Sequence, residues 1–110
     1  MQYRNVWGQL HREDGPAIEY SDGTKVWFLN GLRHREDGPA IEWANGSREW
    51  HLNGQRHRVD GPAYEDLVGN RYWYIRGDNI TIKVETWIKE HHITVPFDKD
   101  TQVLFLLRFL

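Results

Sequence analysis

The sequence predicts an α+β, mainly β fold: an antiparallel meander of 23-residue β-hairpin repeats, capped by one or two helices at the carboxyl terminus. Three observations support this prediction. A 23-residue unit recurs in tandem, the glycines recur at fixed places within it, and no glycine follows Gly77. A chain of 110 residues has room for one compact domain with a core of modest size.

The repeated unit opens on the motif His-Arg-x-Asp-Gly-Pro-Ala. The first two units are identical at 15 of 23 positions, and the third matches the second at 11 positions without a gap. Gly8 holds the place of Gly31, so the array begins with half a unit. We therefore divide the chain into a β-hairpin repeat array over residues 1–77 and a helical cap over residues 78–110, with a half unit at 3–10 and units at 11–33, 34–56 and 57–79.

Glycine indicates where each unit turns. All ten glycines fall on three positions of the unit, and glycine is favoured where φ is positive or where backbones approach closely. In the first unit, residues 17–20 and 24–29 have strand character and flank a Ser-Asp-Gly turn, while Asn30 and Gly31 make a second reversal. Each unit is therefore predicted to form a β-hairpin.

One face of the predicted sheet is the same in every unit. Alternation along the second strand puts Lys25, Trp27 and Leu29 on this face, and equivalent residues recur in the later units. Glu19 lies six residues before Lys25, where a cross-strand acid–base pair is expected. We assign a structural role to this face and to the repeated motif, through His11, Asp14, His34, Asp37, His57, Asp60, Trp27, Trp50 and Trp73.

The opposite face changes from unit to unit. Positions that maintain a scaffold repeat, whereas positions that contact a particular partner are free to differ, so we place the candidate partner-binding surface here. Its residues are Val26, Phe28, Glu49, His51, Tyr72, Tyr74, Trp43 and Tyr64. The alternative is that these residues are unselected surface or irregular core positions.

The carboxyl-terminal segment has a helical pattern. Val84, Trp87, Ile88 and His91 recur at helical spacing within residues 81–92, and Asn79 or Thr81 is the candidate cap. Residues 98–101 suit a second helix start, but the apolar run over 103–110 fits helix or strand. Such a run is buried either within the domain or between chains. A homodimer is therefore an alternative, with candidate contacts at Phe105, Leu106 and Phe109.

The sequence does not predict catalysis or a resident ion. Each unit supplies one histidine and one aspartate of the motif, which is too few ligands for a firm metal site. We expect this histidine to donate to a neighbouring carbonyl and this aspartate to accept backbone N–H groups in its own turn. No convergent triad or phosphate-binding loop is apparent. The prediction is a protein that is not an enzyme and has no catalytic residues, no metal and no cofactor.

Charge and composition restrict the partners. The net charge of −2 provides no long-range attraction to nucleic acid or to an anionic membrane. Arginines interleaved with tryptophan and tyrosine nevertheless keep single-stranded nucleic-acid binding as an alternative, although neighbouring acidic residues oppose it. Cysteine is absent, and the amino terminus lacks the pattern of a signal peptide. We expect a cytoplasmic protein that is neither secreted nor bound to a membrane.

The motif and its spacing resemble a known family. Residues 34–40, His-Arg-Glu-Asp-Gly-Pro-Ala, followed by Trp50-His51-Leu52-Asn53-Gly54, resemble the DGPA repeat proteins of tailed bacteriophages and bacteria, which are loosely similar to MORN repeats. The resemblance covers residues 3–79. It implies a phage accessory protein that acts in the host cytoplasm on a host defence or transcription component, and it brings no catalytic residues.

The prediction for function is therefore a non-enzymatic protein-binding repeat module that inhibits a host protein. Two alternatives remain: a single-stranded nucleic-acid binding protein, and a structural or oligomerising protein. Val59, Asp66 and Arg76 depart from the pattern of the earlier units, so the third unit is expected to be specialised toward the cap or a partner.

Overall fold

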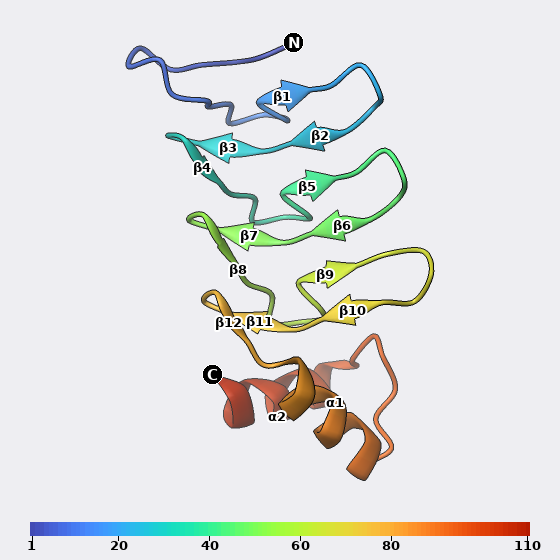
Figure 1. The fold of residues 1–110 in the computed structure, drawn as a ribbon. Coiled ribbons are helices and arrows are strands. Elements are labelled where there is room, and N and C mark those ends of the chain that lie inside the picture. Colours follow the sequence, from blue (N-terminus) through green and yellow to red (C-terminus); the bar gives the residue numbers. More distant parts are fainter.

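The computed structural model describes all 110 residues as an elongated stack of β-hairpin units ending in two helices (Figure 1), with extents of 48 × 27 × 22 Å. This architecture confirms the α+β, mainly β prediction. The elements are β1 (Ile18–Glu19), β2 (Lys25–Val26), β3 (Phe28–Leu29), β4 (Leu32–Arg33), β5 (Ile41–Glu42), β6 (Arg48–Glu49), β7 (His51–Leu52), β8 (Gln55–Arg56), β9 (Tyr64–Glu65), β10 (Arg71–Tyr72), β11 (Tyr74–Ile75), β12 (Asp78–Asn79), α1 (Thr81–Glu90) and α2 (Lys99–Phe109).

The three hairpins join edge to edge into one six-stranded antiparallel sheet, in the order β1-β2-β5-β6-β9-β10. The predicted register, with acidic positions opposite basic ones, is confirmed because Glu19 lies opposite Lys25. The same alternation continues between units, where Lys25 lies opposite Glu42. One face of the sheet therefore carries a continuous row of alternating charge, formed by Glu19, Lys25, Glu42, Arg48, Glu65 and Arg71.

The prediction of one uninterrupted strand over residues 24–29 is wrong, because the chain changes hydrogen-bonding partner at Trp27. The Trp27 N–H donates to the Ala40 carbonyl of the next unit at 2.8 Å, whereas Phe28 pairs with Arg33 of its own unit. Each unit thus forms a second two-stranded ribbon beside the main sheet, seen as β3–β4, β7–β8 and β11–β12 in Figure 1. The simple alternation of faces along the predicted strand ends at this bend.

The second reversal of each unit depends on two successive residues with positive φ. Asn30 and Gly31 have φ values of 48° and 81°, as a type I′ hairpin turn requires. In the third unit Arg76 takes the asparagine position, also with a φ of 48°. Asparagine tolerates this region better than arginine does, so the third ribbon is built at a higher local cost than the first two.

The amino-terminal half unit starts the array, but its turn is one residue longer than those of the later units. The Tyr3 N–H donates to the Ala17 carbonyl at 2.8 Å, as the Trp27 N–H does to Ala40. Tyr3 is therefore the structural counterpart of the repeated tryptophan. The next motif histidine, His11, bonds back to the Tyr3 carbonyl and lies one residue further along than its counterparts do.

The cap continues the hydrogen-bonding pattern of the array. The Ile80 N–H donates to the Trp73 carbonyl at 2.8 Å, the bond that the motif histidine of a further unit would make. The Thr81 hydroxyl accepts the Trp73 N–H at 2.9 Å, in place of the alanine carbonyl that the earlier tryptophans use. Asn79 accepts the Thr81 N–H at 3.0 Å, and Ile80 occupies the N-cap position itself.

An aromatic core holds the cap against the last unit. Trp73 is fully buried and stacks on Phe97, with ring centroids 5.3 Å apart. Trp87 and Phe105 belong to the same cluster, which also contains Ile75, Val84 and Ile88. On α1 the predicted apolar face is buried except for His91, which is exposed because the helix ends at Glu90.

The apolar run near the carboxyl terminus forms a helix. Asp98 caps α2 by accepting the Thr101 N–H at 2.8 Å. Phe105 lies in the core, with Leu106 and Phe109 half-buried. The expectation of intermolecular contacts at Phe105 is therefore wrong: this side chain packs inside its own chain. Neither helix is long and apolar enough to cross a membrane.

Candidate functional site

The repeated motif is organised by its arginine, which connects two consecutive units. The Arg35 guanidinium carbon lies 3.9 Å from the ring centroid of Trp27 in the preceding unit. Its Nε donates to Asp37 at 2.9 Å, and its Nη1 donates to the Pro39 carbonyl at 3.0 Å. Equivalent contacts join Arg12 to Tyr3, Asp14 and Pro16, and Arg58 to Trp50, Asp60 and Pro62.

The motif glycine is required by this arginine rather than by an unusual backbone conformation. A Cβ atom built on Gly38 would lie 3.0 Å from the Arg35 guanidinium carbon, and one on Gly61 would lie 2.8 Å from that of Arg58. Such contacts are too close for the arginine to keep its place. The Asp-Gly-Pro sequence therefore forms a loop that wraps closely around the guanidinium group.

The motif histidine supports the second turn of its own unit. His34 accepts the Asn53 N–H on Nδ1 at 3.0 Å, and His11 and His57 accept the corresponding N–H groups of Asn30 and Arg76. The expectation that these histidines donate to a carbonyl is thus wrong. An Nδ1 that accepts a hydrogen bond is unprotonated, so each ring takes part in its neutral form.

The third unit differs in what faces the histidine. Glu13 and Glu36 place a carboxylate oxygen 3.6 Å from Nε2 of His11 and His34, but Val59 occupies this position beside His57. Desolvation, with a smaller contribution from the positive charge of Arg76, lowers the pKa of His57 below its ordinary value. Protonation of His57 is therefore disfavoured in the folded chain.

The motif aspartates are committed to the arginines. We expected Asp14, Asp37 and Asp60 to accept backbone N–H groups in their own turns, whereas their principal partner is the arginine two residues earlier. The bond from Arg12 lowers the pKa of Asp14. The structure brings no three histidine, cysteine, aspartate or glutamate side chains together where they could hold a metal ion.

Three of the seven other arginines, Arg48, Arg56 and Arg71, are paired with acidic side chains. Arg48 forms an ion pair with Glu65 of the next hairpin, and Arg71 forms two hydrogen bonds of 2.8 Å with Glu85 of α1. The expected acid–base pairs within one hairpin are thus replaced by pairs that link successive units or link the array to the cap. The arginines and lysines of the array without an ion pair are Arg4, Lys25, Arg33 and Arg76.

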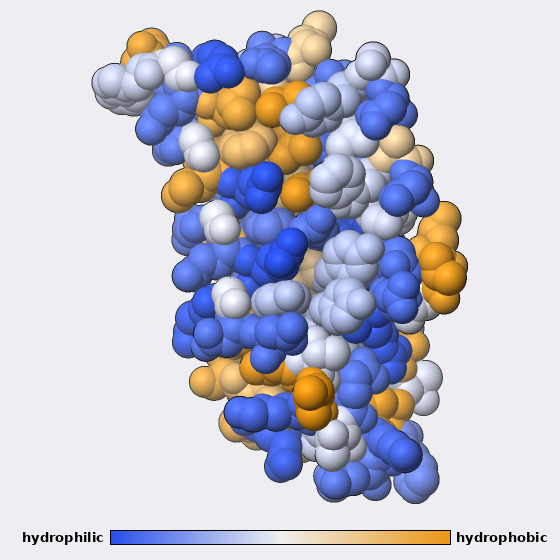
Figure 2. Space-filling view, in the orientation of Figure 1, coloured by the Kyte–Doolittle hydropathy of each residue, from blue (hydrophilic) through white to orange (hydrophobic).

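The variable face is partly interior. Val26, Glu49 and His51 are buried, which corrects the expectation that they form part of an accessible binding surface. Phe28 is half-buried against the small core of Ile18, Val26 and Ile41. Figure 2 shows apolar groups gathered over the first unit and a more hydrophilic surface beside the middle of the stack. Tyr64 and Tyr74 are half-buried, whereas Trp43 and Tyr72 are exposed.

The second unit carries a buried charged network where the first unit has Val26 and Phe28. Glu49 accepts hydrogen bonds from His51 Nε2 at 3.1 Å, from Trp43 Nε1 at 2.8 Å and from Arg56 Nε at 3.2 Å. His51 is almost completely buried, and its Nδ1 has no hydrogen-bond partner. A buried polar atom without a hydrogen-bond partner lowers the free energy of unfolding. We therefore expect this network to stabilise the fold less than the apolar pair of the first unit does.

These contacts hold Glu49 in its charged form. The hydrogen bond from His51 lowers the pKa of Glu49 most, desolvation opposes this effect, and the bonds from Trp43 and Arg56 add to it, which brings the pKa to about 2. Because the folded pKa lies below the unfolded value of 4.5, the stabilisation is fully present above pH 4.5. It is lost as the pH falls toward 2.

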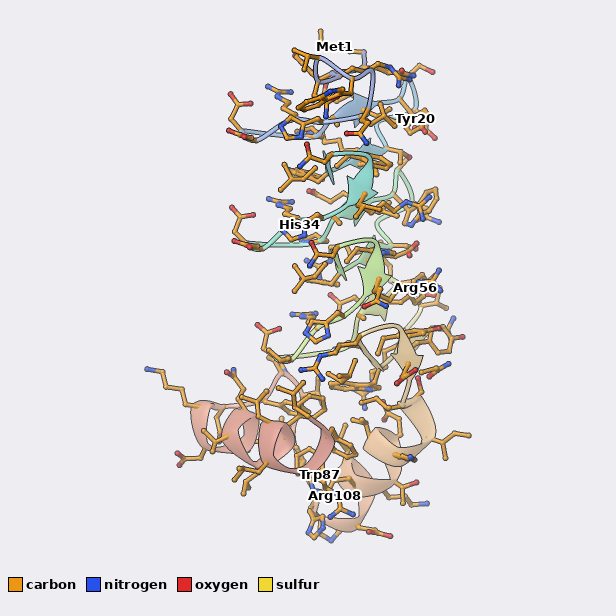
Figure 3. The ribbon with its side chains drawn as sticks, turned by 90° about the vertical axis from the view of Figure 1, so that its left-hand side faces the viewer. Met1, Tyr20, His34, Arg56, Trp87 and Arg108 are labelled. Carbon is orange, nitrogen blue, oxygen red and sulfur yellow. The ribbon has the colours of Figure 1, made fainter.

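One group of exposed apolar side chains lies along the edge formed by the first turn of each hairpin. Tyr20 and Trp43 occupy equivalent positions, while Leu67 and Val68 form the tip of the third hairpin turn. Figure 3 shows Tyr20 and Arg56 on one side of the stack and His34 toward the other. The sequence prediction missed Leu67 and Val68, since strand alternation says nothing about turn tips; their variation between units was the available signal.

A scan against protein-family models and searches of curated proteins and of solved structures find no match to this chain. Membership of the DGPA repeat family therefore stays a prediction from the motif and its spacing. The contacts described above, within the chain itself, provide the basis for assigning a function.

The altered third unit gives a test of the histidine contacts. Replacing Val59 by Glu gives His57 the neighbouring carboxylate that His11 and His34 already have. We therefore expect the pKa of His57 to rise, as measured by NMR titration. In the unchanged chain, the depressed pKa of His57 means that stability is present above the ordinary value of 6.5 and is lost as the pH falls through the folded pKa.

Val59→Gln is the matched control, because the glutamine side chain has nearly the same shape as glutamate but no charge. This variant should leave the pKa of His57 low. Equal pKa values for His57 in Val59→Glu and Val59→Gln would show that the carboxylate at this position does not act on the imidazole.

The buried network of the second unit is tested by converting it to the pair found in the first. Glu49→Val alone leaves His51 buried without its partner, and we expect the free energy of unfolding to fall by about 2 kcal/mol or more. The double variant Glu49→Val with His51→Phe removes both buried polar groups and should lose no more than about 1 kcal/mol. Urea unfolding of both variants measures the difference, and a double variant less stable than Glu49→Val would contradict this assignment.

Proposed function

We propose that this chain is a non-enzymatic protein-binding module whose contact surface is the hairpin-turn edge, defined by Tyr20, Trp43, Leu67 and Val68 together with Tyr72 of the adjoining strand β10. The observation that carries the proposal is the exposure of large apolar side chains at positions that differ between units. Tyr20, Trp43 and Tyr72 are 52%, 43% and 44% exposed. Tryptophan and tyrosine contribute strongly to binding energy in protein interfaces.

The division between repeated and variable positions supports this proposal. The repeated histidines, arginines and aspartates all make structural contacts within or between units. The groups that could perform acid–base chemistry are thus already engaged, and they recur along the stack rather than converge on one pocket. The varying residues on the hairpin-turn edge make few such contacts, which leaves them available to a partner.

The hairpin-turn edge also has the shape of a continuous contact strip. The first turns of the three hairpins project on the same side of the stack (Figure 1), and Figure 2 shows an apolar projection at the height of the β9–β10 turn. Leu67 rests on Gly46, where a Cβ atom would lie 2.6 Å from its Cδ1 atom. Successive turns are therefore in contact, and together they offer one surface rather than separate points.

The resemblance to DGPA repeat proteins favours a host protein as the partner, and inhibition of that protein as the result. Single-stranded nucleic-acid binding is supported less well. Arg48 and Arg71 pair with glutamates, and Arg35 is stacked and bonded inside the motif loop. A nucleic-acid partner would need such groups free to meet phosphates.

The decisive experiment compares two sets of exposed residues on opposite edges. Tyr20→Ser, Leu67→Ser and Tyr72→Ser together should abolish recovery of the partner in an affinity pull-down from host lysate, with little change in the thermal unfolding transition. Val6→Ser with Trp7→Ser is the matched control, because these two exposed residues lie in the amino-terminal turn on the other side of the stack. The control variant should retain the partner.

Recovery of the same partner by the triple variant would refute the assignment of this edge. A partner released by nuclease treatment and by about 0.2 M salt would favour the nucleic-acid alternative instead.

A further inference from the structure

The outer face of α2 is an apolar surface that the chain itself leaves uncovered. Val103, Leu104, Leu107 and Leu110 are all exposed, and Leu107 is 79% exposed. Phe105 and Phe109 point the other way and pack with Trp87. The helix is thus apolar on both sides, and only its inner side has a partner within the chain.

A groove runs beside this exposed face. It encloses about 950 Å³ between the end of α1 and α2, and Leu104, Leu107, Trp87, Ile93 and Pro96 form its apolar part. Leu104 and Leu107 therefore serve as the projecting ridge and also as one wall of the groove. A surface in which the same residues form both parts suits an isologous contact, in which each copy presents the same patch to the other.

The charges on this helix face have the arrangement that an antiparallel pair requires. Asp100 precedes Leu104 by four residues and Arg108 follows it by four, so the three side chains lie along one stripe of the helix. Asp100 and Arg108 are exposed, and neither belongs to the ion pairs of the chain. Two such helices in antiparallel orientation, related by a two-fold axis near Leu104, would place each Arg108 opposite Asp100 of the other copy.

We propose that the chain forms a homodimer through antiparallel packing of α2 against α2 of a second copy, with Leu107 entering the partner's groove and Arg108 paired with the partner's Asp100. His91, His92 and Asp98 lie at the rim of the groove, and Lys99 points away from the Asp100–Arg108 stripe by its place on the helix. The two repeat arrays extend away from the paired caps.

The dimer stands on the cap alone and does not depend on the proposed function. Where that function holds, dimerisation presents two hairpin-turn edges from one assembly, so that a partner with two copies of its epitope is bound more tightly by avidity.

The oligomeric state of the full chain tests the proposal by sedimentation velocity at concentrations up to about 0.1 mM. Leu107→Glu should give a monomer, while Ile82→Glu, which changes an equally exposed residue of α1 outside the patch, should leave the dimer intact. Circular dichroism and thermal unfolding confirm that both variants are folded.

A charge exchange tests the orientation of the helices. Asp100→Arg alone and Arg108→Asp alone should each weaken the dimer by about tenfold or more, because like charges then face each other. The variant with both changes should recover the dimer, although it contains the same substitution at the start of α2 as the first single variant. A monomeric unchanged chain, or single variants as dimeric as the double variant, would overturn the proposal; a dimer lost in the double variant would do so as well.

Discussion

The contact on which the array depends is the stacking of one arginine on an aromatic ring of the preceding unit. Arg35 lies over Trp27 while it bonds to Asp37 and to the Pro39 carbonyl, so a single side chain fixes the distance between units and closes its own loop. Strands of only two residues cannot supply this rigidity by themselves. The motif is therefore read best as a binding loop for its own arginine, with the glycine leaving room for the guanidinium group.

This dependence separates the positions that must repeat from those that can vary. The histidine, arginine, aspartate, glycine and tryptophan of each unit are constrained by contacts within and between units. The last tryptophan is held by Thr81 and Phe97 of the cap instead of by another unit. The Tyr20 side chain makes no such contact, and Trp43 donates one hydrogen bond to Glu49 of its own unit. A scaffold of this kind can keep its framework while its hairpin-turn edge changes.

Much of the fold follows from the sequence, because glycine phase and strand periodicity are local signals. They predict the hairpins, the opposition of Glu19 to Lys25 and the first helix, whereas they leave residues 103–110 as either helix or strand. They do not predict the bend at Trp27, which depends on a hydrogen bond to the next unit. The sequence also did not predict that Glu49 and His51 are buried. Alternation along a strand divides its side chains between two faces but does not show which face is covered. The arginine stack could have been found from the constant spacing between the tryptophan and the next motif arginine. Arginines near aromatic residues are, however, equally typical of a nucleic-acid binding surface.

The central role of the arginine stack is tested most directly by a double-mutant cycle between Trp27 and Arg35. Trp27→Leu, Arg35→Met and the variant with both changes would be compared with the unchanged chain by urea unfolding. A stack that joins the two units predicts a coupling free energy of about 1 kcal/mol, with the double variant more stable than the sum of the single losses implies. Losses that add to within about 0.3 kcal/mol would contradict it.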